Sequence, residues 1–236
     1  MQGERTTSPW VWVGLGCLTA VVLGVAVVAT LGYLGYQKVR ELEAEMKDPA
    51  AREAAVLEVL GAEALPEGYH AMVGFSVPFL MKVAVLSDRE PDPEGDPGGF
   101  EERGFIYVEM LQQGGGRDEL RDYFEGRTED AEILRQHDIR IDADEVLGRG
   151  TLQPEGGSIL WLASRGNVQM ARSASEGLTT LMLIECEPRD SRGRLGIWFG
   201  PDPQPDTAAA EVDFAGTPAD PAAIESFLSP FSVCPR

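Results

Sequence analysis

Apolar residues are concentrated near the start of the chain, and farther along they occur in short runs broken by polar residues. No charged residue occurs between Arg5 and Lys38, and residues 10–36 are apolar at nearly every position. A helix rises about 1.5 Å per residue, so this run reaches roughly 40 Å, enough to cross a hydrocarbon core of about 30 Å. The pattern predicts a transmembrane helix over residues 10–36, preceded by a short polar tail over residues 1–9.

Two kinds of cleaved leader compete with this interpretation. A signal peptide has a basic start and an apolar run of about 7–15 residues, whereas this run is much longer and follows only Arg5 beside Glu4. A lipoprotein signal would use Cys17, but Gly14 stands where a larger aliphatic residue is usual, and apolar sequence continues well beyond. We therefore expect an uncleaved, single-pass signal anchor.

Small residues recur along one face of this predicted span. Gly16, Ala20 and Gly24 are spaced four apart, which lets two helices approach closely. The spacing predicts a homodimer through the transmembrane helix. The alternative is that Gly and Ala are simply common in such helices.

The orientation of the anchor follows from two opposing signals. Lys38, Arg40, Lys47 and Arg52 follow the run, and the positive-inside rule would place them, and the domain after them, in the cytoplasm. Single-span bacterial proteins with a short N-terminal tail more often export the following domain. We favour an exported domain in the cell envelope and keep the cytoplasmic orientation as the alternative.

Residues 37–61 have the pattern of a helical neck. Val39, Leu42 and Met46 form one apolar seam. Asp48-Pro49 then has the signature of an N-cap and first helical residue, and Gly61 supplies a stop. The expected second helix therefore ends at residue 60, where the neck meets the domain.

Residues 62–236 show the periodicities of a mixed domain. Apolar or alternating runs predict strands at residues 79–86, 104–111, 139–144, 159–163, 181–186 and 195–199. Helices are expected at residues 118–125 and 128–135, and after the second cap-and-proline pair, Asp220-Pro221. Strands joined by short connections favour antiparallel pairing. We predict an α+β fold: a mostly antiparallel sheet with flanking helices, after the transmembrane helix and neck.

The two ends of this domain carry a resemblance. The entry Leu-Pro-Glu-Gly-Tyr at residues 65–69 and the closing helix Asp-Pro-Ala-Ala-Ile-Glu-Ser-Phe-Leu-Ser-Pro-Phe at residues 220–231 resemble those of Mog1/PsbP/DcrB-like domains. The layout is also similar to that of uncharacterised single-pass membrane proteins of GC-rich bacteria. The resemblance implies an α+β binding module and assigns no functional residue.

Charge narrows the range of partners. The whole chain has a formal charge of -19, and from Gly61 onward 15 Lys and Arg stand against 32 Asp and Glu, a net charge of -17. Such a surface repels nucleic acid and anionic lipid and favours a protein or cationic partner. We therefore expect a protein partner and no nucleic-acid partner, besides the lipid bilayer around the anchor.

Two of the three cysteines lie outside the apolar run. Cys186 falls late in a predicted strand and Cys234 near the end of the chain. In an exported domain this pair suggests a disulfide that holds the C-terminus, whereas in a reducing cytosol the two would be free thiols.

The search for chemistry yields no catalytic, cofactor-binding or metal-binding motif. His70 and His137 are isolated, and we interpret both as surface or cap residues. The acidic cluster at residues 92–96 partly resembles a calcium loop, but Pro97 stands where a glycine is needed and Arg103 where a bidentate glutamate should bind. A second acidic cluster, at residues 142–145, lies on a predicted strand with its two aspartates on the solvent face. We interpret both clusters as solvated surface. A final group, Trp161, Trp198 and Phe199, could form a ligand platform, although apolar neighbours favour core packing.

The sequence thus predicts a membrane-anchored, non-catalytic binding or scaffolding protein of the bacterial cell envelope, without a cofactor. Two alternatives stay open. One is a regulatory membrane protein that faces the cytoplasm, and the other is a membrane-tethered enzyme of unrecognised class.

Overall fold

The computed structural model describes residues 48–91, 99–111, 116–136, 141–170, 173–188, 190–232 and 234. The predicted span over residues 10–36 and its packing face, Gly16, Ala20 and Gly24, lie outside these residues. Among the helices that are described, none has both the length and the apolar character needed to cross a membrane.

The core of the domain is a seven-stranded sheet in the order β1-β2-β3-β7-β6-β5-β4. Every neighbouring pair of strands is antiparallel. The strands are β1 (His70–Val77), β2 (Met81–Ser87), β3 (Gly104–Leu111), β4 (Ile141–Leu152), β5 (Gly157–Met170), β6 (Ser173–Cys186) and β7 (Arg192–Gly200). Two antiparallel meanders, β1–β3 and β4–β7, thus meet where β3 pairs with β7, and the α+β fold predicted from the sequence is confirmed.

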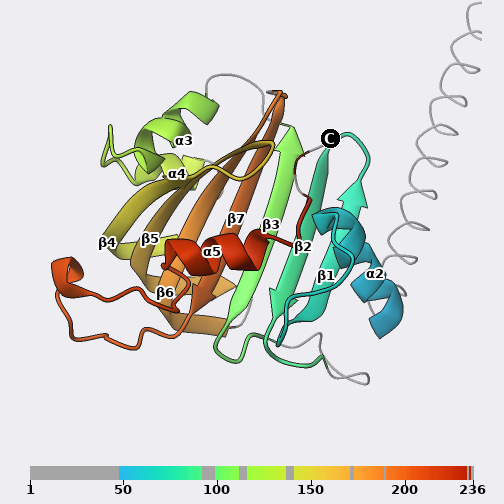
Figure 1. The fold of residues 1–236 in the computed structure, drawn as a ribbon, viewed down its shortest axis with the longest axis horizontal. Helices are drawn as coiled ribbons and strands as arrows, with labels where there is room; N and C mark the ends of the chain where they lie inside the picture. Colours follow the sequence, from blue (N-terminus) through green and yellow to red (C-terminus); the bar gives the residue numbers. More distant parts are fainter. Residues whose placement is uncertain are drawn as a thin grey trace, which may run out of the picture. The chain divides into compact units, whose positions relative to one another are not determined.

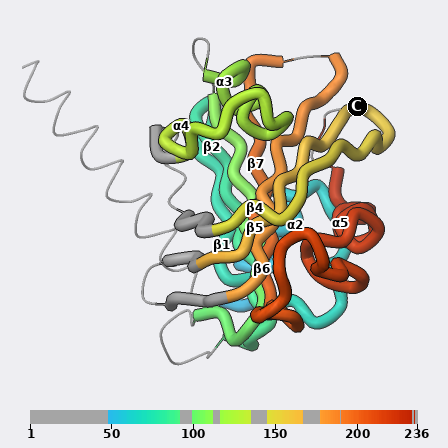
Figure 2. Tube along the Cα trace, turned by 90° about the vertical axis from the view of Figure 1, so that its left-hand side faces the viewer, coloured from blue at the N-terminus to red at the C-terminus, as the bar shows by residue number. Residues whose placement is uncertain are grey.

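Helices cover both faces of the sheet. Figure 1 shows α2 (Pro49–Leu60) and α5 (Pro221–Leu228) in front of the strands, and α3 (Gly116–Phe124) and α4 (Glu132–Gln136) beyond them. Figure 2, turned by 90°, places α5 and α4 on opposite sides of the strands. A short 3-10 helix, η1 (Ala209–Glu211), lies in the long connection between β7 and α5.

Alternation along the central strands gives each face its own core. On β5 and β6, Ile159, Trp161, Met182 and Ile184 pack with α2 and α5. The residues between them, Leu160, Leu162, Leu181 and Leu183, pack with the buried side chains of α3 and α4. Because successive side chains of a strand point to opposite faces, a strand buried on both sides is apolar without interruption. This explains the continuous apolar runs of the two strands.

Helix α2 belongs to the domain and is not part of a neck. Its N-cap Asp48 accepts a hydrogen bond from Ala50 N at 3.0 Å, and Gly61 closes it in the left-handed conformation, as the sequence predicts. However, Val56 and Leu60 are fully buried in the sheet core. The structure therefore includes α2, predicted as part of the neck, in the domain, because the apolar face of the helix is covered by the sheet.

A glycine lets α2 approach the sheet. A Cβ atom built on Gly74 of β1 would lie 2.5 Å from Val56 N and 2.8 Å from Ala55 C. Arg52 adds a polar contact, since its Nε donates a hydrogen bond to Ala71 O at 2.9 Å. The helix and β1 are therefore in direct backbone-level contact, as expected for parts of one folded unit.

The predicted elements agree with the structure mainly where apolar runs are long. The strand expected at 104–111 coincides with β3, and α5 begins after Asp220 as the capping signal predicts. Strand β1 was absent from the prediction, and β4, β5 and β6 are each much longer than the predicted segments. Most of the added residues are polar or small, and pairing with neighbouring strands holds them in the sheet.

Candidate binding site

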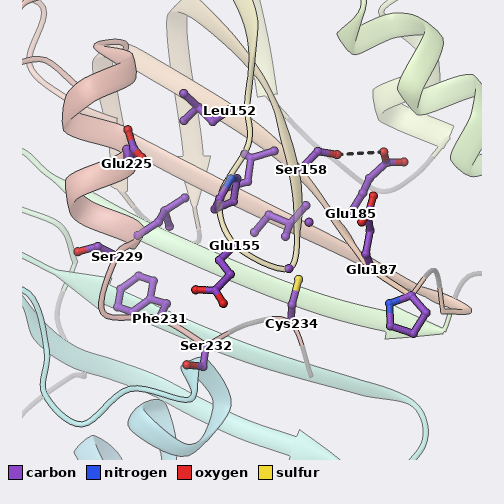
Figure 3. A pocket seen from close by; sticks show the side chains of 17 residues that line it. Leu152, Glu155, Ser158, Glu185, Glu187, Glu225, Ser229, Phe231, Ser232 and Cys234 are labelled. Carbon is purple, nitrogen blue, oxygen red and sulfur yellow. Dashed lines mark hydrogen bonds between the residues drawn. The ribbon is translucent and has the colours of Figure 1, made fainter. Parts of the chain in front are cut away.

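A cavity of about 510 Å³ opens between α5, the β4–β5 turn and the end of β6. Figure 3 shows the side chains that surround it, contributed by segments far apart in the sequence. The volume is within the range of about 300–1,000 Å³ that is usual for ligand sites.

The floor of the cavity is apolar. Ile159 of β5 and Ile184 of β6 are register partners, and both side chains face α5. Leu152, at the end of β4, and Leu228, at the end of α5, extend this surface. Phe231 closes one side and packs against Phe105 with ring centroids 5.7 Å apart.

The rim of the cavity carries three exposed carboxylates. Glu155 comes from the β4–β5 turn, Glu187 from the chain just after β6, and Glu225 from α5 (Figure 3). No Lys, Arg or His is among the lining residues. The cavity thus combines an apolar floor with an acidic rim.

A fourth glutamate, Glu185, lies at the cavity wall but directs its carboxylate elsewhere. It accepts a hydrogen bond from Ser158 Oγ at 3.5 Å, drawn in Figure 3. Arg117 Nε lies 3.5 Å from Oε1 and Arg121 Nη2 lies 3.4 Å from Oε2. Because α3 supplies both cations, the charge of Glu185 is compensated on the other face of the sheet.

A disulfide holds one wall of the cavity in place. The structure joins Cys186, at the end of β6, to Cys234, with the two Cα atoms 5.4 Å apart. The segment before Cys234 is held further by Ser232 N, which donates a hydrogen bond to Leu60 O at 3.0 Å. Residues 229–234, called the C-terminal strap below, also border a second, more open cavity of about 730 Å³ beside Gly61 and Leu65.

A buried network of charges lies on β3 and β7, on the face of the sheet that also carries the cavity. Arg194 is 2% exposed, and its Nε donates a hydrogen bond to Glu109 Oε2 at 3.1 Å, while its Nη2 lies 2.6 Å from Asp190 Oδ2. The hydrogen bond from Arg194 lowers the pKa of Asp190 below its ordinary value. Burial raises the pKa of Tyr107, whose hydroxyl donates to Glu109 Oε2 at 3.2 Å.

This network is internally compensated. Arg192 Nη1 donates to Glu109 Oε1 at 2.7 Å, and Lys82 Nζ lies 3.9 Å from the same oxygen. A carboxylate surrounded by three cations has little capacity for a further ligand. We interpret the network as a structural link between β2, β3 and β7.

The aromatic residues considered as a ligand platform belong to the core. Trp161 is 7% exposed and Phe199 is 2% exposed. Trp198 stacks on Phe227 with ring centroids 4.4 Å apart, and its Nε1 donates a hydrogen bond to Tyr69 Oη at 2.8 Å. The preference for core packing is therefore confirmed.

The other candidate residues are dispersed or not described. His70 begins β1, while His137 and the acidic cluster at 92–96 lie outside the described residues. In the second cluster, Glu145 pairs with Arg165 at 3.0 Å. Within the part of the chain that the structure describes, no group of three or more His, Cys, Asp or Glu side chains is arranged to hold a metal.

Sequence reasoning missed the cavity itself. Its three rim glutamates stand alone in the sequence, 32 and 38 residues apart, and nothing in their local pattern marks them as a group. The usable signals were indirect: the predicted Cys186–Cys234 pairing, which brings the strap to β6, and Glu225 on a helix whose apolar face must lie on the sheet.

The fold and the cavity together define the class: an antiparallel α+β domain with an acidic, apolar-floored cavity closed by a disulfide-linked strap. Comparison with protein-family models, curated proteins and solved structures gave no match to this chain.

Proposed function

We propose that this protein is a membrane-anchored binding module of the bacterial cell envelope, and that its cavity holds a cationic, amphipathic peptide segment of a partner protein. The observation that carries the proposal is the cavity of about 510 Å³, with its apolar floor and three glutamates at the rim. No recognisable catalytic constellation accompanies it among the described residues, so binding is the function that the site supports best.

The chemistry of the cavity selects the ligand class. Leu152, Ile159 and Ile184 offer a surface for aliphatic or aromatic side chains. Each rim carboxylate would attract a Lys or Arg of the ligand by about 1 kcal/mol at 4 Å in water, and by more where the pair is partly shielded. A ligand with alternating cationic and apolar side chains can pair with the rim carboxylates and pack on the apolar floor. An acidic ligand would be repelled by the three carboxylates.

The predicted anchor and the disulfide support the proposed location. The predicted transmembrane helix over residues 10–36 would hold the domain at the membrane. The disulfide between Cys186 and Cys234 supports export, because such bonds persist in oxidising compartments and are rare in the cytosol. Reporter fusions at the C-terminus test this part, since a phosphatase active only outside the membrane should be active and a cytoplasmic reporter should not.

A peptide-binding experiment tests the cavity. The full chain in detergent micelles is titrated with a fluorescent nine-residue peptide of alternating Lys and Leu, and with its Glu and Leu counterpart. Binding of the Lys peptide alone is the expected result. A triple variant, Glu155→Gln, Glu187→Gln and Glu225→Gln, should weaken that binding at least tenfold.

A matched control distinguishes the effect of the rim carboxylates on peptide binding from the effect of the net charge of the protein. Three exposed glutamates outside the cavity, Glu67, Glu129 and Glu211, are changed to Gln in a second triple variant. Its net charge equals that of the cavity variant, so general attraction would weaken binding equally in both. Equal weakening, or no binding of the Lys peptide at all, contradicts the proposed site.

A further inference from the structure

The turn between β1 and β2 is an exposed apolar projection. Phe79 is 81% exposed, Leu80 is 61% exposed and Val77 is 38% exposed. Leu111, at the end of β3, is 40% exposed and adjoins them, since its N–H donates a hydrogen bond to Leu80 O at 3.1 Å. Four of the five large hydrophobic residues found exposed in the described part of the chain thus gather at one corner of the sheet, called the hairpin tip below.

The backbone of the hairpin tip is held in one conformation. Leu80 N donates a hydrogen bond to Val77 O at 3.0 Å, which closes a four-residue turn. Pro78 occupies the second position of this turn, and Phe79 occupies the third with φ 67°. A turn with proline second and a positive φ third is a type II turn, in which the third residue is normally glycine.

Phenylalanine at this position is unfavourable for the turn, and its ring packs little against the rest of the domain. A non-glycine residue with positive φ is strained, and such strain is concentrated at functional positions. Here the strained residue also leaves its ring 81% exposed to water. Folding alone would be served better by glycine, so the aromatic ring points to a contact outside the domain.

We propose that the hairpin tip inserts into the lipid bilayer in which the chain is anchored. This inference rests on the membrane anchor of the proposed function. No charged residue lies between Val77 and Met81, so the tip offers an aromatic and an aliphatic side chain to the acyl region.

Anchoring also explains why so small a surface suffices. Two large side chains bind a membrane weakly when the protein is free in solution. When the chain is already tethered to the bilayer, the second contact is intramolecular, and its effective concentration is high. The tip would then fix the orientation of the domain, and hence of its cavity, above the membrane.

The test places a fluorophore at the hairpin tip of the full chain in phosphatidylcholine vesicles. Leu80→Cys is labelled with bimane in a Cys17→Ser background under non-reducing conditions, which preserve the native disulfide. Vesicles with brominated acyl chains should quench its emission at least twofold. Val146→Cys is the control, because Val146 is 36% exposed on β4 at the opposite edge of the sheet, and its label should not be quenched.

A second variant separates insertion from a structural role. Phe79→Gly in the Leu80→Cys chain should abolish most of the quenching and leave the urea midpoint of the domain unchanged or higher, because glycine suits the turn. Three results would contradict the insertion in chains that float with the vesicles. They are an unquenched label at residue 80, equal quenching at residue 146, and quenching that survives Phe79→Gly. A blue shift without quenching would indicate burial against protein and also contradict it. Chains that fail to float contradict the anchor as well.

Discussion

Removing the disulfide should destabilise the domain strongly, and the size of the effect follows from the chain between the two cysteines. Cys186 and Cys234 are 48 residues apart in the sequence. In the chain-entropy model, opening a loop of this length lowers the free energy of unfolding by about 4 kcal/mol at 25 °C. For a domain of this size, that corresponds to a decrease in Tm of about 8–16 °C. The double variant Cys186→Ala and Cys234→Ala removes both partners and so leaves no unpaired thiol in the domain.

Urea unfolding of the full chain in micelles measures this difference. Trp161 and Trp198 both lie in the domain core and report its unfolding by fluorescence. Wild-type protein with excess reductant should unfold at nearly the same urea concentration as the double variant, and reductant should not change the variant. If the free energy of unfolding decreases by less than about 1 kcal/mol, the reasoning is refuted. The disulfide would then contribute little to holding the strap on β6.

Three further changes test other parts of the structure. Gly74→Ala should cost about 1–3 kcal/mol in urea unfolding because its Cβ would lie 2.5 Å from Val56 N, and an unchanged midpoint would contradict the close packing of α2. Arg194→Met should cost about 1–3 kcal/mol in urea unfolding, since Glu109 and Asp190 lose a buried hydrogen-bonded cation while Arg192 still pairs with Glu109. Hydrogen bonds from Gly216 N and Ala222 N lower the pKa of Asp220, so its stabilising effect is present at neutral pH and is lost as pH falls below about 4. Asp220→Asn should flatten this acid dependence in urea titrations from pH 6 to pH 2.

Local signals in the sequence were sufficient for several elements. The Asp-Pro pairs at 48–49 and 220–221 mark the starts of α2 and α5, because a side-chain acceptor followed by proline satisfies the first turn of a helix. The largely apolar run at 104–111 matches β3, because a central strand covered on both faces is apolar over most of its length.

Other features depend on contacts that no local pattern reveals. The neck interpretation of α2 failed because its tertiary contact depends on Gly74, a residue that weakens the strand signal of β1 while it admits the helix. The polar ends of β5 and β6 extend beyond their apolar runs because each strand pairs with a neighbour along its length. The cavity joins a turn, a strand end and a C-terminal helix, and only the folded topology brings these together.

Ion pairs within the domain determine where its net charge of -17 can attract a ligand. Cations of the described residues are largely engaged by carboxylates of the same domain: Lys82, Arg103, Arg117, Arg121, Arg127, Arg165, Arg192 and Arg194 all form ion pairs. Few cations therefore remain to neutralise other acidic side chains, and none lines the cavity where Glu155, Glu187 and Glu225 converge. A uniform acidic surface would repel anions without selecting a partner. Three carboxylates around an apolar floor instead favour a cationic ligand with apolar side chains. The excess of acidic residues can therefore make the cavity specific for such a ligand.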